Sequence, residues 1–101
     1  MKIITEKEFE NEIKEGVTLV DFFATWCMPC KMMAKILEEV EGKLPANSKI
    51  VKVDVDESES LARKFGILSI PTIIIFKDGQ QVFKHVGLMQ EEDCLQAIEN
   101  A

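Results

Sequence analysis

The sequence is constrained most by a short stretch where a buried strand meets a pair of cysteines. Residues 19–24 read LVDFFA and are almost all apolar, which is typical of a strand covered on both faces. Cys27 and Cys30 follow directly, and Pro29 between them suits the first turn of a helix, where its missing N–H is no loss. Two thiols held in this way can close a disulfide and open it again. The stretch therefore predicts a reversible two-electron switch where a strand passes into a helix.

Helices and strands are predicted to alternate along the rest of the chain. Thr5 and Glu8 form a capping-box pattern that opens a first helix, and Gly16 is placed to end it. Asp78 and Gly79 are a strong hairpin signal between the last two strands. Strands are also expected over residues 17–24, 50–55, 72–77 and 80–86. Three further helices are expected: one over about 29–41, one that is capped by Asp56 and ends at Gly66, and a last one with Cys94, Ile98 and Ala101 on one face. This order predicts an α/β protein, a single domain over residues 1–101, with a central mixed sheet flanked by helices on both faces.

Length and composition favour one small globular domain outside the secretory pathway. The chain has 101 residues, of which 47% are apolar, enough to fill one core. No apolar run approaches the ~18 residues that a membrane-spanning helix needs. The first residues turn polar at once, so we expect no signal peptide, and three cysteines are too few for a disulfide-stapled secreted domain. We therefore expect a cytoplasmic protein. Its net charge of −6 disfavours binding to nucleic acid and to anionic membranes.

Seven short motifs are spread over nearly the whole chain. They are Leu19-Val20-Asp21-Phe22, Trp26-Cys27-x-Pro29-Cys30-Lys31-Met32, Val53-Asp54-Val55-Asp56, Phe65-Gly66-Ile67, Ile70-Pro71-Thr72, Phe76-Lys77-Asp78-Gly79 and Val86-Gly87. In this order and spacing they resemble the thioredoxin family, and the resemblance implies the thioredoxin fold and its strand order. Two positions depart from the family pattern. Met28 replaces a usual Gly, and Lys35 replaces a frequent Pro, so we expect the helix to be straighter at Lys35.

The two cysteines are expected to play different parts. Cys27 stands at the helix start, where unpaired N–H groups and the helix dipole stabilise a thiolate. Cys30 lies about one turn further into the helix, so we expect its sulfur to be more buried. Cys27 would then attack a substrate disulfide, and Cys30 would attack Cys27 to release the reduced substrate.

Two other roles for the cysteine pair stay open from the residues alone. A tetrahedral zinc site needs four ligands, and only Cys94 and His85 remain to complete it. A purely structural disulfide would close a very short loop and would remove little entropy from the unfolded chain. Both fit the pattern less well than a redox pair does.

Asp21 is an acid inside an otherwise apolar strand. Burying a carboxylate is unfavourable unless it is paired or protonated, so Asp21 is a candidate proton shuttle. The resemblance implies the same role, with Cys30 as the partner. Lys52 on the next strand is expected to offset the charge of Asp21. The strand pattern leaves open that Asp21 lies at an exposed edge and that Lys52 is a solvated lysine.

The resemblance also implies a docking site for substrates around Cys27. The Ile70-Pro71-Thr72 segment matches a cis-proline loop, which would leave the backbone of Ile70 free to pair with an extended substrate segment. The substrate-binding residues that we expect are Trp26, Met28, Pro29, Ile70, Pro71 and Gly87, with Leu88 beside them. Trp26 could equally be half-buried scaffold, and Gly87 could simply form a turn at a strand end.

Two further residues with reactive side chains are expected to have ordinary roles. Cys94 shares a helix face with Ile98 and is expected to be a small buried apolar residue. His85 is expected at the surface of an edge strand.

The resemblance implies an enzyme, a protein disulfide oxidoreductase that reduces substrate disulfides through Cys27 and Cys30. It would act as a monomeric electron carrier with no bound cofactor and no metal. A separate thioredoxin reductase, often a flavoprotein fed by NADPH, would reload the dithiol. Two alternatives stay open. Because Met28 changes the residues between the cysteines, the enzyme could be poised as an oxidase or isomerase. The fold could also be a protein-binding module in which thiol chemistry is incidental.

Overall fold

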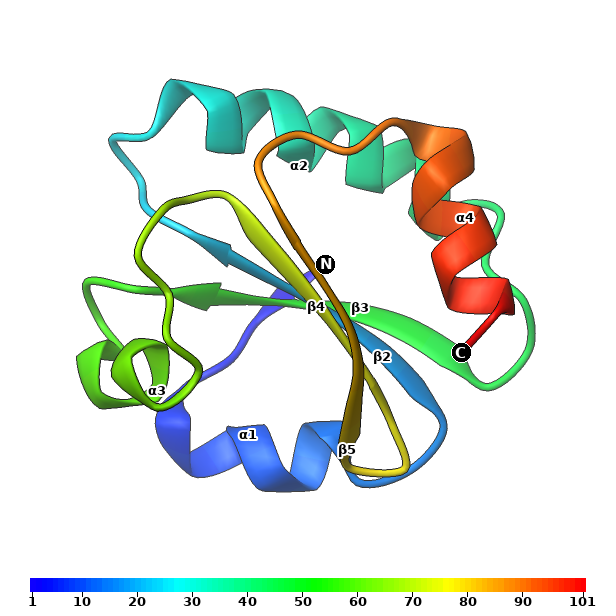
Figure 1. The fold of residues 1–101 in the computed structure, drawn as a ribbon, viewed down its shortest axis with the longest axis horizontal. Coiled ribbons are helices and arrows are strands. Elements are labelled where there is room, and N and C mark those ends of the chain that lie inside the picture. The colour runs from blue at the N-terminus through cyan, green and yellow to red at the C-terminus, as the bar shows by residue number, and fades with distance from the viewer.

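A mixed β-sheet forms the middle layer of the molecule (Figure 1). The computed structural model describes all residues, 1–101. The five strands follow the order β1-β3-β2-β4-β5 across the sheet. Their bounds are Lys2–Ile3 (β1), Val17–Phe23 (β2), Ser48–Asp54 (β3), Thr72–Lys77 (β4) and Gln80–Val86 (β5). The central strand β2 runs parallel to β3 and antiparallel to β4, and β5 pairs antiparallel with β4 at one edge.

Helices cover both faces of this sheet. Their bounds are Glu6–Ile13 (α1), Met28–Glu41 (α2), Glu59–Lys64 (α3) and Glu91–Glu99 (α4). In Figure 1, α2 and α4 lie above the sheet, and α1 and α3 lie below it. The expected arrangement of a central mixed sheet with helices on both faces is therefore confirmed. None of the helices combines the length and the apolar character needed to cross a membrane.

Side chains of β2 alternate between two apolar cores, one on each face of the sheet. Val20 packs in a core with Phe9 of α1 and Leu61 of α3. Its neighbour Leu19 belongs to the other core, which includes Leu37 of α2. Because successive side chains of a strand point to opposite faces, a strand buried on both sides needs an almost unbroken apolar run. The sequence of β2 meets that requirement.

The first two helices begin and continue as the sequence predicts. The backbone N–H of Thr5 donates to the Glu8 side chain at 2.9 Å, which completes the expected capping box. The helix α2 runs without interruption over Met28–Glu41, across Lys35. A lysine keeps the backbone N–H that a proline would remove. That α2 is straighter than helices with proline at this position remains a prediction.

Both ends of the chain differ from the sequence-based expectation. The strand β1 is two residues long, and both of its side chains are exposed. It has no alternating pattern by which sequence alone could reveal it, and it forms by pairing with β3. At the other end, α4 stops at Glu99, so Ala101 packs against the core from outside the helix.

The expected cap of α3 at Asp56 is wrong. The helix begins at Glu59, and Ser58 is its N-cap residue. Asp54 turns the chain before the helix, because its side chain accepts the N–H of Asp56 at 2.9 Å and its carbonyl accepts the N–H of Ser58 at 2.9 Å. Asp56 is thereby left in the turn, with its carboxylate free for another partner.

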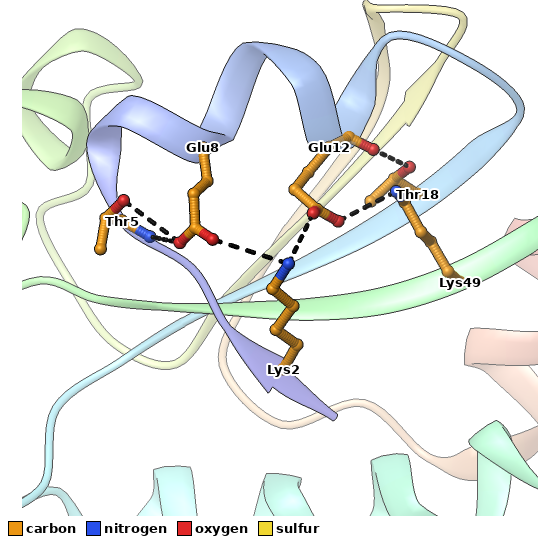
Figure 2. A network of polar contacts seen from close by, with 6 residues as sticks. All are labelled: Lys2, Thr5, Glu8, Glu12, Thr18 and Lys49. Carbon is orange, nitrogen blue, oxygen red and sulfur yellow. Dashed lines mark hydrogen bonds and ion pairs between the residues drawn. The ribbon is translucent and has the colours of Figure 1, made fainter.

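Glu12 ties α1 to three strands, as Figure 2 shows. Its carboxylate accepts hydrogen bonds from Lys2 of β1 at 2.9 Å and from Lys49 of β3 at 3.0 Å. Its backbone carbonyl accepts the hydroxyl of Thr18 on β2 at 3.4 Å. The hydrogen bonds from Lys2 and Lys49 hold the pKa of Glu12 below its ordinary value.

We expect Glu12→Gln to lower the free energy of unfolding at pH 7 by up to about 1 kcal/mol. A carboxylate with a depressed pKa stabilises the fold above its ordinary pKa of 4.5 and loses that contribution as the pH falls through the folded value. The effect should therefore vanish below about pH 3. Urea titrations at both pH values measure it. Glu10→Gln is the control, since Glu10 is exposed and reaches only Lys64, at 3.5 Å. An equal loss at both pH values would contradict the electrostatic account.

Candidate active site

Cys27 and Cys30 form a disulfide at the point where β2 passes into α2, with their Cα atoms 5.2 Å apart. Cys27 is the N-cap residue of α2, and its Sγ accepts the backbone N–H of Cys30 at 3.2 Å. Pro29 lies in the first turn, where a missing N–H is harmless. A helix N-terminus carries unpaired N–H groups and the positive end of the helix dipole. The sulfur of Cys27 therefore lies where negative charge is stabilised.

The two cysteines differ more in position than in burial. Cys27 is 5% exposed and Cys30 is 2% exposed, so the expected difference in burial is present but small. Both pack in one apolar cluster with Phe23 and Ala24. What separates them is the helix, because Cys27 caps it and Cys30 lies inside its first turn.

The loop before β4 lies against Cys27. The Ile70–Pro71 peptide bond is cis, as the resemblance implied, and the carbonyl oxygen of Ile70 is 3.9 Å from Sγ of Cys27. The N–H of Gly87 donates to the carbonyl of Pro71 at 2.8 Å, so the segment after β5 is held against the same loop. Ile70 itself takes part in no backbone hydrogen bond. Its backbone is therefore open to another chain segment beside the disulfide.

Apolar side chains are exposed around this loop and the disulfide. Trp26 and Met28, the neighbours of Cys27 in the chain, are 68% and 65% exposed. Pro29 is also exposed, Leu88 is partly exposed, and Ile70 is half-buried. The alternative that Trp26 is half-buried scaffold is therefore wrong. Pro71 is buried beneath this surface.

The indole of Trp26 is held by a contact that sequence reasoning missed. Its Nε1–H donates to the carboxylate of Asp56 at 2.8 Å. The two residues are 30 positions apart in the chain, so no local signal in the sequence points to this pair. Through this hydrogen bond, Asp56 fixes the ring at the edge of the site.

Asp21 is fully buried and has no hydrogen-bond partner for either carboxylate oxygen. The alternative that it lies at an exposed edge is wrong, because β2 is the central strand. Burial raises the pKa of Asp21 to about 6, and the positive charge of Lys52 opposes this in part. The carboxyl group is therefore poised to gain or lose a proton near neutral pH.

Strand geometry places Asp21 close to the disulfide end of β2. Asp21 and Phe23 point to the same face of the strand, and Phe23 packs against both cysteines. Lys52 is the register partner of Asp21 on β3, and its Nζ lies 4.3 Å from the centre of the Phe23 ring. Lys52 is half-buried, so it is not simply a solvated strand lysine. It acts on Asp21 by charge, without a hydrogen bond.

The other reactive side chains lie outside the site. Cys94 is buried in the core between the sheet, α2 and α4, as predicted, and burial raises the pKa of its thiol to about 11, with the charge of Asp93 adding to the effect. His85 is half-buried, with Nε2 3.0 Å from the carbonyl oxygen of Leu88, so the expected surface position is only partly right. Nowhere do three or more His, Cys, Asp or Glu side chains gather as ligands for a metal ion.

The disulfide is nearly buried beside exposed apolar side chains, and it is far from a broad hollow elsewhere on the molecule. That hollow, of about 800 Å³, lies at the opposite end of β2, around Gly16, Asn47 and Asp78. A disulfide at a helix N-terminus, with open backbone and exposed apolar side chains beside it, is suited to exchange with the disulfide of another protein chain. Fold and site together define a thiol–disulfide oxidoreductase that acts on proteins.

Comparisons with known proteins specify this class further. The thioredoxin family model matches residues 1–100. The thioredoxin of Staphylococcus saprophyticus is 50% identical over 96 residues, covering 95% of this chain and 92% of that protein. The thioredoxin of Staphylococcus aureus is 46% identical with the same coverage. Among solved structures, Plasmodium falciparum thioredoxin superposes with a TM-score of 0.88 at 35% identity, covering 99% of this chain and 98% of that one. Chloroplastic thioredoxin z gives 0.89 at 31% identity, covering 99% and 92%.

The chain belongs to the thioredoxin family, and its fold is the thioredoxin fold. It is a protein disulfide oxidoreductase that works by dithiol–disulfide exchange and reduces the disulfides of substrate proteins. Membership of the family implies disulfide-bearing proteins as substrates and a reductase as partner.

We expect Asp21→Asn to raise the free energy of unfolding at pH 8 by about 1–3 kcal/mol. The folded pKa of about 6 lies above the ordinary value of 3.8. Between these pH values the folded protein holds a proton that the unfolded chain has lost, so stability falls as the pH rises through this window and stays lower above it. A neutral amide removes this loss. Denaturant titrations at several pH values measure the gain, which should disappear below about pH 4.

Asp93→Asn is the matched control, because Asp93 is an exposed aspartate on α4. It should give no gain in stability at pH 8. If Asp21→Asn is less stable than the unaltered protein at pH 8, the carboxylate has a stabilising partner and the account of its burial is wrong.

Proposed function

We propose that Cys27 is the nucleophile of the reducing enzyme and Cys30 the resolving thiol. The observation that carries this assignment is the N-cap position of Cys27, whose Sγ accepts the N–H of Cys30 at 3.2 Å. A thiolate is the attacking species in disulfide exchange, and this N–H together with the helix dipole stabilises a thiolate at Cys27. Cys30, inside the helix turn, attacks second.

The electrons balance over two exchanges. The Cys27 thiolate attacks one sulfur of a substrate disulfide, so that a mixed disulfide forms and the substrate's own S–S bond breaks. The Cys30 thiol then loses its proton and attacks Sγ of Cys27. This second exchange forms the Cys27–Cys30 disulfide, releases the second substrate thiol, and completes the transfer of two electrons to the substrate. The disulfide of the present structure corresponds to this oxidised end state.

Asp21 is proposed as the acceptor of the Cys30 proton. It lies on the face of β2 that carries Phe23, and Phe23 packs against Cys30. A general base works best when its pKa is near the working pH, and burial raises the pKa of Asp21 to about 6. Lys52 moderates this shift through its charge, so its proposed role is to tune the acidity of Asp21.

Substrates are proposed to dock on the surface formed by Trp26, Met28, Pro29, Ile70 and Gly87, with Pro71 buried beneath it as support for the loop. An extended substrate segment would pair with the open backbone of Ile70, which gives affinity without demanding a particular sequence. Gly87 has a φ of +98°, a conformation that favours glycine, and a Cβ built there would meet no atom within 4 Å. The absence of a side chain leaves room for a partner's backbone.

The setting of the reaction is also part of the proposal. The chain would work as a monomer and as a single domain over residues 1–101, in the cytoplasm, where a reducing environment keeps the dithiol available. The reductase that reloads it would be a flavoprotein that draws electrons from NADPH. If the protein dimerised at working concentration, or required another electron donor, the proposed setting would be revised. The proposed roles of the cysteines and of Asp21 would not change.

Variants that lack one cysteine of the pair test which cysteine is the nucleophile and which is the resolving thiol. We expect Cys27→Ser to abolish disulfide reduction and Cys30→Ser to attack once and then accumulate a mixed disulfide, because its resolving thiol is gone. Mass spectrometry of each variant after incubation with an oxidised substrate protein measures the adduct. Cys94→Ala is the control, since it removes the third thiol while keeping the buried side chain small and apolar, and it should behave as the unaltered protein. Trapping by Cys27→Ser in place of Cys30→Ser would reverse the assignment.

One alternative, an enzyme poised toward oxidation or isomerisation, can be tested at Met28. This residue is 65% exposed between the cysteines, where the family usually has glycine. We expect Met28→Gly to fold normally and to change the redox potential by about 30 mV or less. Equilibration with glutathione redox buffers measures this potential. A potential of the unaltered protein close to that of oxidising relatives, with a large drop in Met28→Gly, would favour the alternative.

A further inference from the structure

The exposed apolar side chains of this protein gather at one end of the sheet. Of the eight large apolar residues that are exposed, Ile3 and Val82 lie elsewhere, and the other six are Trp26, Met28, Met32, Leu68, Val86 and Leu88. Single exposed apolar residues are normal on a protein surface, whereas a contiguous group of them marks an interaction site.

Trp26 and Met28 are chain neighbours of Cys27, and chain position and strand pairing place the other residues on the same side of the molecule. Met32 follows Met28 by one turn on α2, so both side chains lie on the same exposed helix face. Val86 is the register partner of Thr72, and the segment after it is bonded to Pro71. Leu68 lies two residues before Ile70, whose carbonyl oxygen is 3.9 Å from Sγ of Cys27.

Leu68 is the most exposed of the large apolar residues. It is 97% exposed, on the loop between α3 and β4, and so it contributes almost nothing to the core. It takes part in no backbone hydrogen bond, and neither does Ile70. Figure 1 shows this loop at the same end of the sheet as the connection from β2 to α2. Leu68 and Ile70 therefore keep backbone groups free for a partner, while the carbonyl of Ser69 between them accepts the hydroxyl of Thr72 at 2.6 Å. Leu68 adds an exposed apolar side chain two residues from the carbonyl that lies against the reactive sulfur.

We propose that Leu68 is a specificity-determining residue, which favours substrate disulfides whose cysteine has a large apolar residue within two or three positions in the chain. This inference rests on the proposed docking of an extended substrate segment along Ile70. Two residues span at most about 7 Å, so a segment paired with Ile70 reaches Leu68 within the same distance. Only an apolar substrate side chain would gain by covering an exposed leucine there, because it removes apolar surface from water on both partners.

The test compares three disulfides as substrates of the reduced protein. Two are short peptides with one central cysteine, each oxidised to its symmetric dimer, with leucine in one and serine in the other at the second position on either side. The third is bis(hydroxyethyl) disulfide, which has no chain to reach Leu68. The unaltered protein should reduce the leucine peptide with a higher kcat/KM than the serine peptide.

We expect Leu68→Ser to lower kcat/KM for the leucine peptide about tenfold, which corresponds to about 1.4 kcal/mol. The serine peptide and bis(hydroxyethyl) disulfide should change less than about twofold. Leu68→Met should retain the preference, since it keeps an apolar side chain of similar size. Val82→Ser is the matched control, because Val82 is 49% exposed on β5 near the hairpin turn, and it should leave all three rates unchanged.

Each other outcome has a definite meaning. Equal losses for both peptides, or no loss for the leucine peptide, would overturn the role of Leu68 while leaving the reductase intact. Failure of the unaltered protein to reduce any of the three disulfides would instead contradict the proposed function. Because Leu68 is outside the core, denaturant midpoints of Leu68→Ser and the unaltered protein should agree, and a large drop would also overturn the proposal.

Discussion

The pairing of β2 with a strand on each side is the constraint on which the reactive site depends. Phe22 of β2 is the register partner of Thr72 on β4, and Thr72 is in turn the partner of Val86 on β5. These pairings bring the end of β2, the start of β4 and the end of β5 together at one end of the sheet. The disulfide, the cis-proline loop and Gly87 are continuations of those three strands. A register slip of one residue would turn every side chain of β2 to the wrong face.

The central position of β2 also explains why the pKa of Asp21 is raised so strongly. A residue of β2 has a strand on each side and a helical layer over each face, so Asp21 is excluded from water on all sides. The nearest positive charge comes from the neighbouring strand, and it does not form a hydrogen bond with Asp21. The fold thereby loses stability at neutral pH in exchange for a carboxyl group that can take up a proton beside a buried thiol.

Much of the fold could be predicted from sequence because its signals are local. The apolar run of β2, the capping box at Thr5 and the turn at Asp78-Gly79 each depend on neighbouring residues only. The strand β1 could not be predicted, because it exists only through pairing with β3. Asp56 was assigned to the wrong role for a similar reason. Its actual partner, Trp26, is distant in the sequence and is brought to it by the fold.

The candidate site likewise has some features that the sequence predicts and others that it does not. The cysteine pair and its place at a helix start follow from the local sequence, and the docking loop follows from motifs shared with a family. The full burial of Asp21, its lack of hydrogen bonds and the exposure of Leu68 depend on how the layers pack. They required the three-dimensional structure.

The central claim is that Asp21 accepts the proton of Cys30 when the mixed disulfide is resolved. The most direct test is the single-turnover rate of that resolution step, measured by rapid mixing across pH for the unaltered protein and for Asp21→Asn. The account predicts a rate that rises with pH through an inflection near the Asp21 pKa of about 6. In Asp21→Asn this inflection should be absent and the rate at neutral pH lower by about 100-fold. An unchanged profile in Asp21→Asn would contradict the claim.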